Sequence, residues 1–283
     1  MRIKFLLLEK LKMKLNQISY IKNYIKKIVF THKNLYYIYI FLKHIKYNIF
    51  SLHLHHYPII DIVVCGMPRS GSTLLFNILR EIVRIDLDKS DGFFTTDKQY
   101  ALVIKSERSY IVKKTHNLSW IIIKRIKKKK SIGFFTHRDI RDIFVSMMQI
   151  GWIKDFKTFL NYHLPRIINI ALIYAGVKNM HIYSYEQLIN NKIEILKNLQ
   201  TILNIKLDEN SIAKILKKTS IDETNKKVSK LAKNQEYDPS SHIHRNHIRD
   251  AKIGKWKDKL TEYQIKLINL RTKKYLTYFN YDD

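Results

Sequence analysis

The stretch VVCGMPRSGSTLL, residues 63–75, constrains the fold more than any other part of the chain. The apolar, β-branched run Ile59–Cys65 leads into it and is typical of a buried parallel strand. Ser72–Arg84 follows, with its apolar residues spaced along one helical face. Only 7 of the 283 residues are glycine, yet Gly66 and Gly71 both lie in this turn, where the backbone must turn tightly or approach a ligand closely. The stretch therefore predicts a strand, a tight turn and a helix.

Strand and helix patterns continue to alternate along the chain. Further strands are expected at Tyr110–Val112, Ile132–Thr136 and His181–Ser184. The expected helices are Leu118–Ile126, Ile140–Met148, Phe156–Tyr174, Tyr185–Asn204, one or two within 208–232, and Glu262–Phe279, with a loop at 234–257. This alternation implies an α/β fold, a parallel β-sheet flanked by helices, in the three-layer architecture of P-loop nucleotide hydrolases. We assign this domain to residues 58–283.

Residues 1–57 differ in composition from the rest of the chain. They carry eleven Lys or Arg and one acidic residue, Glu9, interleaved with Ile, Leu, Tyr and Phe. We expect a basic, amphipathic, helical extension that packs on the main domain. The alternative is peripheral contact with an anionic membrane surface. The apolar run Phe5–Leu8 is too short for a signal peptide.

The formal net charge of +28 favours anionic partners. Lysine, isoleucine and asparagine are abundant while alanine and glycine are scarce, as in A+T-rich coding, so part of the charge needs no specific nucleic-acid partner. The single cysteine, Cys65, excludes an intrachain disulfide. No window reaches the roughly 18 uncharged apolar residues that a spanning helix needs. We expect a cytoplasmic protein, with peripheral membrane contact through residues 1–57 as the alternative.

The turn in residues 63–75 is close to a nucleotide-binding phosphate loop, but it lacks the lysine of such loops. Ser72 stands in the lysine position, and no apolar strand ends in an aspartate that would hold magnesium. The free N–H groups of a helix N-terminus remain, together with the hydroxyls of Ser72 and Thr73 and the cation Arg69. These groups suit a terminal phosphate that is linked to a second group. The bond between the two would be polarised by the protein without a metal ion.

A second anion site is expected in THRDIRDIFVS, residues 136–146. Arg138 follows an apolar strand, and Ser146 lies two turns into the next helix. An arginine fork and a hydroxyl suit a second phosphate.

With these two stretches the chain resembles the PAPS-dependent sulfotransferases, whose donor is 3′-phosphoadenosine-5′-phosphosulfate. Residues 68–73, PRSGST, match the family loop that cradles the 5′-phosphosulfate, which assigns Arg69, Ser70, Gly71, Ser72 and Thr73 to donor binding. Arg138 and Ser146 have the spacing of the pair that binds the 3′-phosphate. The resemblance runs from about Ile59 to the final helix.

The resemblance extends to the C-terminal part of the chain. Arg249, Gly254, Trp256 and Lys257 stand at the spacing of the family segment that closes over the 3′-phosphate. Tyr185 corresponds to a tyrosine near the adenine, and Thr219-Ser220 match weakly a Thr-Ser pair beside the base.

The expected general base is His116. Lys114, Thr115 and His116 resemble the Lys-Thr-His of cytosolic sulfotransferases, in which the histidine deprotonates the acceptor and the lysine assists at the sulfonate. On this interpretation Arg69 and Lys114 stabilise the charge that develops on the bridging oxygen. Carbohydrate and tyrosyl-protein sulfotransferases use a carboxylate instead, so an acidic base remains an alternative, with candidates Glu81, Asp86, Asp88 and Asp91.

Two departures from the cytosolic group bear on the acceptor. Arg69 replaces the usual lysine, and Leu74 stands where an adenine-stacking tryptophan is common. The arginine form is typical of carbohydrate- and protein-directed relatives, so a glycan hydroxyl or a small alcohol is expected, with an amine as a further option. Residues 85–109 and 150–175 carry no recognisable chemistry for the acceptor.

The sequence thus predicts metal-independent, in-line transfer of a sulfuryl group from PAPS to an acceptor. Two alternatives remain. One is a P-loop kinase of a small molecule, which Ser72 in the lysine position disfavours. The other is a non-catalytic basic protein that binds nucleotides or a membrane surface.

Overall fold

A computed structural model of the chain describes residues 59–87, 93–97, 100–104, 109–231, 235, 237–238, 241–245 and 251–282. For Ile59, for residues 86–87 and for the described residues between 93 and 109 it describes the backbone alone. Several predictions therefore lie outside the described residues. They concern the N-terminal extension, Arg249, and the candidate acids Asp88 and Asp91, together with the side chain of Asp86.

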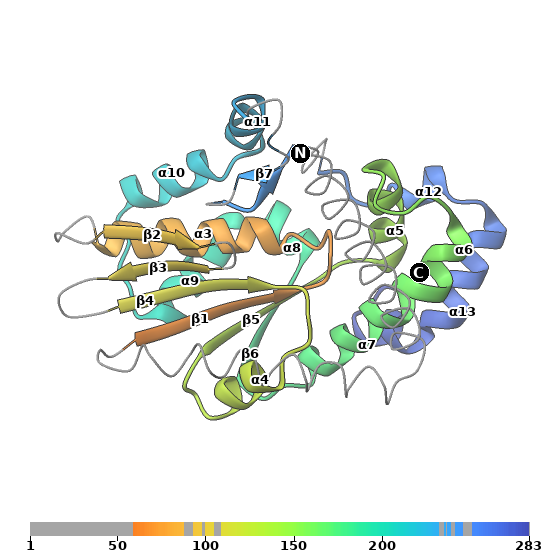
Figure 1. The fold of residues 1–283 in the computed structure, drawn as a ribbon, viewed down its shortest axis with the longest axis horizontal. Helices are drawn as coiled ribbons and strands as arrows, with labels where there is room; N and C mark the ends of the chain where they lie inside the picture. Colours follow the sequence, from red (N-terminus) through yellow and green to blue (C-terminus); the bar gives the residue numbers. More distant parts are fainter. Residues whose placement is uncertain are drawn as a thin grey trace, which may run out of the picture.

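The core of the fold is a six-stranded sheet with the order β2-β3-β4-β1-β5-β6 (Figure 1). Its strands are β1 (Ile59–Gly66), β2 (Phe93–Asp97), β3 (Tyr100–Ile104), β4 (Ser109–Thr115), β5 (Ile132–His137) and β6 (Met180–Ser184). The four strands β4, β1, β5 and β6 run parallel. The predicted parallel sheet is thereby confirmed. The hairpin of β2 and β3, which the sequence did not predict, extends it in antiparallel fashion.

Strand β1 is buried on both sides of the sheet. Ile62 and Val64 face one hydrophobic core, whereas Val63 and Cys65 face the other. Two cores need apolar residues at successive positions, which explains why residues 62–65 are all apolar. The one charged residue of the strand, Asp61, is buried and pairs with Lys113 Nζ at 2.8 Å. The central strand is therefore held rigidly, and its carboxyl end presents the turn that follows in a fixed place.

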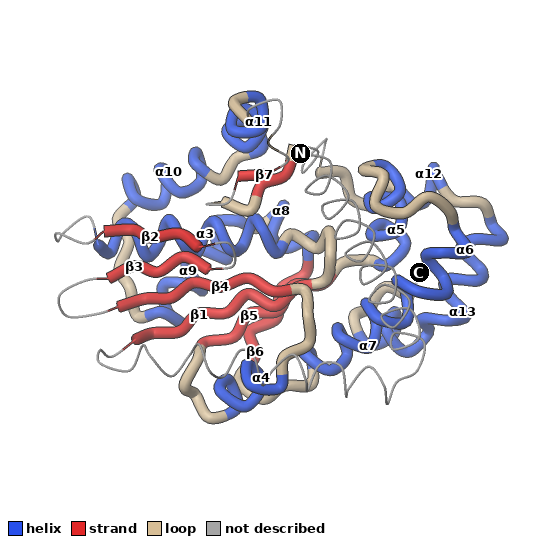
Figure 2. Tube along the Cα trace, viewed as in Figure 1, coloured by secondary structure: helices blue, strands red, loops and turns tan. Residues whose placement is uncertain are grey.

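Helices cover both faces of the sheet (Figures 1 and 2). On the face of Ile62, the core includes residues of α3 (Ser72–Leu87), α8 (Tyr185–Asn190), α9 (Lys192–Leu203) and α10 (Glu209–Lys218). On the face of Val63, it includes α4 (Trp120–Lys127), α5 (Ile140–Gln149), α7 (Leu164–Ala175) and α13 (Glu262–Tyr278). The three-layer α/β fold expected from the sequence is confirmed.

Two of the predicted helices are interrupted. Phe156–Tyr174 consists of α6 (Phe156–Thr158), the π-helix η2 (Phe159–His163) and α7. The predicted helix Tyr185–Asn204 breaks at Asn191, which has φ −119° and ψ 40° and precedes α9. Asparagine competes with helical backbone through its own side chain, and here Asn191 Nδ2 donates to Glu194 Oε2 at 3.4 Å.

The last quarter of the chain closes the fold. After α11 (Ile221–Ser229), the predicted loop at 234–257 contains the short strands β7 (Tyr237–Asp238) and β8 (Ile243–His244) and the start of α12 (Trp256–Lys259). Helix α13 then returns to the carboxyl ends of the parallel strands (Figure 1). There the buried Tyr275 hydroxyl donates to the Arg138 carbonyl at 2.6 Å. Among the described residues no helix has the length and apolar character needed to cross a membrane.

Candidate active site

The turn between β1 and α3 adopts a backbone that its sequence explains. Gly71 has φ +81°, and a Cβ there would lie 2.9 Å from Leu188 Cδ1. A Cβ on Gly66 would lie 2.5 Å from Ser72 Cβ and would also collide with Thr136. Arg69 has φ 63°, an uncommon value for a residue with a side chain. The two glycines therefore allow a turn so tight that β5 and α8 pack directly against it.

Ser70 stabilises this turn through buried hydrogen bonds. Its hydroxyl lies 2.7 Å from the Met67 carbonyl and 2.7 Å from Thr136 Oγ1, and the residue is fully buried. Its backbone N–H also bonds to the Met67 carbonyl, at 3.3 Å. Both donors of Ser70 thus serve the turn, so Ser70 shapes the loop. Its contact with a phosphate stays a prediction.

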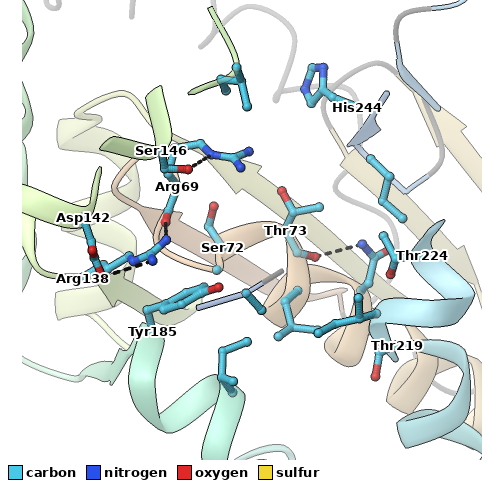
Figure 3. Close-up of a pocket in the computed structure, with 18 of the residues that line it drawn as sticks. Arg69, Ser72, Thr73, Arg138, Asp142, Ser146, Tyr185, Thr219, Thr224 and His244 are labelled. Atoms are coloured by element: carbon cyan, nitrogen blue, oxygen red, sulfur yellow. Dashed lines mark hydrogen bonds and ion pairs between the residues drawn. The ribbon is translucent and has the colours of Figure 1, made fainter. Parts of the chain in front are cut away.

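A large pocket opens at the turn, at the carboxyl ends of β1, β4 and β5 (Figure 3). We call it the loop pocket. Nine of the predicted site residues line it. They lie in the turn, at the start of α3, at the ends of β4 and β5, in α5 and in α8: Arg69, Gly71, Ser72, Thr73, Lys114, His116, Arg138, Ser146 and Tyr185. Helix α3 begins at Ser72, so its unpaired backbone N–H groups belong to the same wall.

The two predicted phosphate stretches meet through one hydrogen bond. Arg69 Nε donates to Ser146 Oγ at 2.9 Å, and so the turn contacts α5 within the pocket (Figure 3). Burial, and then the nearby charge of Arg138, lowers the pKa of Arg69 to about 10. Arg69 remains a cation at neutral pH, in surroundings that hold excess positive charge. Such surroundings attract an anion.

Arg138 lies at the end of β5 and is almost fully buried. Its Nη2 donates to Asp142 Oδ2 at 3.2 Å and to the Lys252 carbonyl at 2.9 Å, while its Nη1 donates to the Arg69 carbonyl at 3.3 Å. The guanidinium lies 3.9 Å from the ring centre of Tyr185. Its buried Nε has no hydrogen-bond acceptor among the described residues. Buried donors are nearly always satisfied, so this atom marks a place where an anionic ligand would complete the site.

Asp142 joins Arg138 to the C-terminal part of the chain. Its fully buried carboxylate accepts from the backbone N–H of Gly254 at 2.8 Å and from that of Trp256 at 3.1 Å. Gly254, predicted to contact the 3′-phosphate, therefore uses its N–H on Asp142 and does not line the loop pocket. Ala251, Lys252 and Lys255 line it from the same segment.

His116 follows β4 and is held by a single hydrogen bond. Its Nδ1 lies 2.7 Å from the Gly66 carbonyl oxygen. A carbonyl can only accept, so Nδ1 carries the proton and Nε2 carries the lone pair. Burial, and then the charge of Lys114, lowers the pKa of His116 to about 3. The imidazole is therefore neutral at neutral pH, with one nitrogen available to take a proton.

Lys114 stands beside this histidine at the end of β4. Burial, followed by the charge of Arg69, lowers the pKa of Lys114 to about 8. The ammonium group is thus protonated at neutral pH but holds its proton weakly. A negative charge developing nearby would be stabilised by both Lys114 and Arg69.

The acidic alternative for the base has little support among the described residues. Glu81 forms an ion pair with Lys218 Nζ at 2.8 Å and a weaker one with Arg84 at 3.4 Å, and it does not line the loop pocket. The only carboxylate in the described lining is Asp142, whose oxygens already accept three hydrogen bonds or ion-pair contacts. Asp86, Asp88 and Asp91 have no described side chains.

Several residues of the pocket were not predicted. Asp142 is one of them, although it lies four residues after Arg138, a spacing at which side chains at the start of a helix can meet. Other members of the lining belong to no motif: Asn77, Trp152, Lys192, Thr224 and Lys227. Thr219 of the weak Thr-Ser match does line the pocket, whereas the Ser220 hydroxyl accepts from the Glu223 N–H at 3.1 Å and caps α11. Leu74, which stands where relatives commonly have an adenine-stacking tryptophan, also lines the pocket.

Comparisons with known proteins agree with this fold. The crystal structure of mouse sulfotransferase SULT7A1 complexed with PAP is 16% identical, with a TM-score of 0.51 over 75% of this chain and 84% of that one. Retinol dehydratase with androsterone and the inactive cofactor PAP is 15% identical, with a TM-score of 0.51 over 76% and 80%. Its complex with retinol and PAP is equally similar, at 15% identity and TM-score 0.51 over 76% and 81%. These likenesses support the fold.

A search of curated proteins gives no match. A family model, described as the sulfotransferase domain, matches residues 60–279. That range contains the turn, both predicted phosphate stretches and the histidine at the end of β4. The chain belongs to the sulfotransferase-domain family.

Proposed function

We propose that the chain transfers a sulfuryl group from PAPS to a hydroxyl, or to an amine, of a small acceptor and releases adenosine 3′,5′-bisphosphate. One observation carries this proposal. Lys114, Arg69 and a neutral His116 with its lone pair on Nε2 line one pocket, beside the backbone cradle of the turn. These are the base and the cations that in-line sulfuryl transfer needs.

The roles of the donor-binding residues follow from their positions. The N-terminus of α3, with Ser72 and Thr73, would hold the 5′-phosphate. Arg138 and Ser146 would hold the 3′-phosphate, which would supply the acceptor that Arg138 Nε lacks. Tyr185, already stacked on Arg138, would border the adenine. The PAP in the structures of SULT7A1 and retinol dehydratase supports this assignment for the donor.

The chemical step assigns one role to each of three side chains. As the oxygen of the acceptor hydroxyl forms a bond to sulfur, His116 Nε2 takes the proton of that hydroxyl. The bond between sulfur and the bridging oxygen of the 5′-phosphate breaks, and its electron pair stays on that oxygen. Arg69 and Lys114 stabilise the resulting negative charge. We propose that no metal is required, because these two cations already stand where the charge develops.

Thermal shift separates this proposal from the kinase and from a non-catalytic basic protein. Adenosine 3′,5′-bisphosphate at about a hundred times its dissociation constant should stabilise the fold by about 2.7 kcal/mol. The stabilisation should appear with EDTA present, and ATP with magnesium should give much less. Stabilisation by ATP–Mg alone would identify a kinase. Equal effects of both compounds, abolished by moderate salt, would indicate nonspecific binding to a basic surface.

A further inference from the structure

A partly buried polar cluster lies next to the wall of the loop pocket, and the proposed chemical step does not use it. The Tyr281 hydroxyl donates to Glu186 Oε2 at 2.9 Å and lies 3.1 Å from His137 Nδ1. His137 directly precedes Arg138, and Glu186 directly follows Tyr185. Arg138 and Tyr185 both line the loop pocket. One hydroxyl near the end of the chain thus contacts the chain neighbours of both residues.

The fold of the C-terminus directs Tyr281 to this cluster. Helix α13 ends in a Schellman motif, in which the N–H of Asn280 donates to the Thr277 carbonyl at 3.3 Å. The N–H of Tyr281 donates to the Leu276 carbonyl at 2.8 Å. Asn280 has φ 58°, a left-handed conformation that asparagine tolerates better than most residues. Arg141 Nη2 donates to the Tyr281 carbonyl at 2.7 Å, so the backbone of Tyr281 is fixed without its hydroxyl.

The hydrogen bonds of the cluster have one consistent direction. Burial, and then the charge of Glu186, raises the pKa of Tyr281, so the phenol keeps its proton at neutral pH. That proton is donated to Glu186, and the phenol oxygen therefore accepts from the Nδ1–H of His137. Burial lowers the pKa of His137 to about 4, so the imidazole is neutral at neutral pH. The chain of bonds runs from His137 through Tyr281 to Glu186.

The Glu186 carboxylate depends on the Tyr281 hydroxyl. Its other oxygen, Oε1, is buried and has no hydrogen-bond partner among the described residues. In that part of the chain the Tyr281 hydroxyl is the one hydrogen-bond donor to this carboxylate. An unpaired carboxylate in such surroundings is strongly unfavourable. We expect that loss of the hydroxyl would make Glu186, and with it the first turn of α8, shift towards water.

Both ends of this chain of bonds act on Arg138. His137 pairs with Ser184 across β5 and β6, and its backbone leads directly into Arg138. Glu186 follows Tyr185, whose ring centre lies 3.9 Å from the Arg138 guanidinium (Figure 3). The position of the guanidinium therefore depends on the end of β5 and on the start of α8 together.

From these contacts we propose that Tyr281 is a positioning residue for the 3′-phosphate of the donor, and that it thereby sets the selectivity for nucleotides that carry this phosphate. Its hydroxyl holds His137 and Glu186, and through them it holds Arg138 in the arrangement that binds the phosphate. The inference rests on the proposed function, because that function assigns the 3′-phosphate to Arg138. Tyr281 does not line the loop pocket, so it acts without touching the donor.

Tyr281→Phe tests the proposal, because it removes the hydroxyl and retains the ring and the backbone bond to Arg141. Calorimetric titration compares adenosine 3′,5′-bisphosphate with adenosine 5′-monophosphate, which lacks the 3′-phosphate. The wild type should bind the bisphosphate about 10- to 100-fold more tightly, the range of one hydrogen bond to a charged group. In Tyr281→Phe this ratio should fall by about 3- to 10-fold, while the affinity for the monophosphate changes by less than about twofold. A general loosening of the fold would weaken both nucleotides and leave the ratio unchanged.

Tyr278→Phe is the matched control. It removes a hydroxyl from the same end of α13, where Tyr278 is half exposed and donates to the Ala175 carbonyl at 3.4 Å. Both affinities should keep their wild-type values. A double variant then tests the proposed route. When Tyr281→Phe is combined with Glu186→Gln, the loss in the ratio should be smaller than the product of the two single losses, because both changes act on one hydrogen bond.

Each outcome decides one proposal. An unchanged ratio in Tyr281→Phe overturns the role of Tyr281, as do losses that simply multiply in the double variant. If the wild type binds the two nucleotides equally, the assignment of the 3′-phosphate to Arg138 is wrong. If it binds neither, the proposed function itself fails. Should Tyr281→Phe not fold, Glu186→Gln decides, because exchanging the charged acceptor for a neutral one must also lower the ratio.

Discussion

At the scale of single residues, the site depends on two ionisable side chains whose pKa values are lowered. Lys114 and His116 are neighbours at the end of β4, and burial is the largest cause of the lowered pKa of each. The result is a cation and a neutral base side by side at neutral pH. In water the lysine would keep its proton to higher pH, and the imidazole would gain one at mildly acidic pH.

Replacing His116 with alanine separates catalysis from binding. Transfer should fall by about 10²- to 10⁴-fold, the usual contribution of a general base. The affinity for adenosine 3′,5′-bisphosphate should change little, because His116 bonds to the Gly66 carbonyl at the end of β1 and no contact with the bisphosphate is assigned to it. Initial rates with labelled PAPS and calorimetric titration with the bisphosphate measure the two effects. Unchanged turnover would move the role of base to an acidic residue such as Asp86 or Asp88.

The pH dependence should report Lys114. Its pKa of about 8 means that the ammonium loses its proton, and the site loses a cation, as the pH rises through 8. We expect kcat/KM to fall above about pH 8 and to stay level down to pH 6, since the imidazole of His116 remains neutral there. In Lys114→Arg the alkaline decline should move to higher pH. A decline near pH 6.5 instead would contradict the lowered pKa of His116.

At the scale of elements, Asp142 connects α5 to the segment at 251–256. Its carboxylate carries a charge that pairs with Arg138 and accepts two backbone N–H groups. Arg138, the proposed ligand of the 3′-phosphate, and the C-terminal segment are therefore positioned by one side chain. Asp142 is a positioning residue, because it acts through these partners.

Asp142→Asn should weaken donor binding while the fold persists. The amide keeps one acceptor oxygen but loses the charge and the second acceptor, so the bisphosphate should bind about 10- to 100-fold more weakly, equivalent to about 1.5–3 kcal/mol. Asp258→Asn is the matched control, since Asp258 and its partner Lys252 are both exposed and such pairs contribute little. Equal affinities in the two variants would show that Asp142 does not position the site.

The elements also show what the sequence can and cannot predict. Strand β1 and helices α3 and α13 were predicted to within about three residues, because their apolar patterns are local. The hairpin of β2 and β3 was not predicted, since no strand was expected in residues 85–109. Most site residues were predicted from motifs, but Asp142 was not. Its partners Gly254 and Trp256 lie 112 and 114 residues away, a distance over which periodicity carries no information.

At the scale of the whole molecule, several buried histidines link stability to pH. Burial lowers the pKa of His137 to about 4 and, together with the charge of Lys114, that of His116 to about 3. In the unfolded chain each histidine has a pKa near 6.5. The unfolded state therefore binds more protons between pH 6.5 and 4, and acidification favours unfolding across that window.

The melting temperature should accordingly fall between pH 7 and pH 5. A fully shielded histidine loses about 2 kcal/mol of stabilisation over the 1.5 units below its unfolded pKa, and a partly hydrated one loses less. His137→Phe should make the dependence shallower while preserving the stacking on Phe279, whose ring centre lies 4.0 Å from that of His137. Calorimetric scans at several pH values measure the slope. A slope identical to that of the wild type would show that His137 titrates normally.

The bond between Tyr275 and the Arg138 carbonyl has a consequence for protein synthesis. The two residues are 137 positions apart, and Asp142 bonds to the N–H group of Gly254, which is 112 positions away. At about 5–20 residues per second, a ribosome needs on the order of ten seconds to cover that distance. During this interval Arg138 lacks the Lys252 carbonyl, and Asp142 lacks the N–H groups of Gly254 and Trp256. We therefore expect the growing chain to have an incomplete donor site until its last helix has left the exit tunnel.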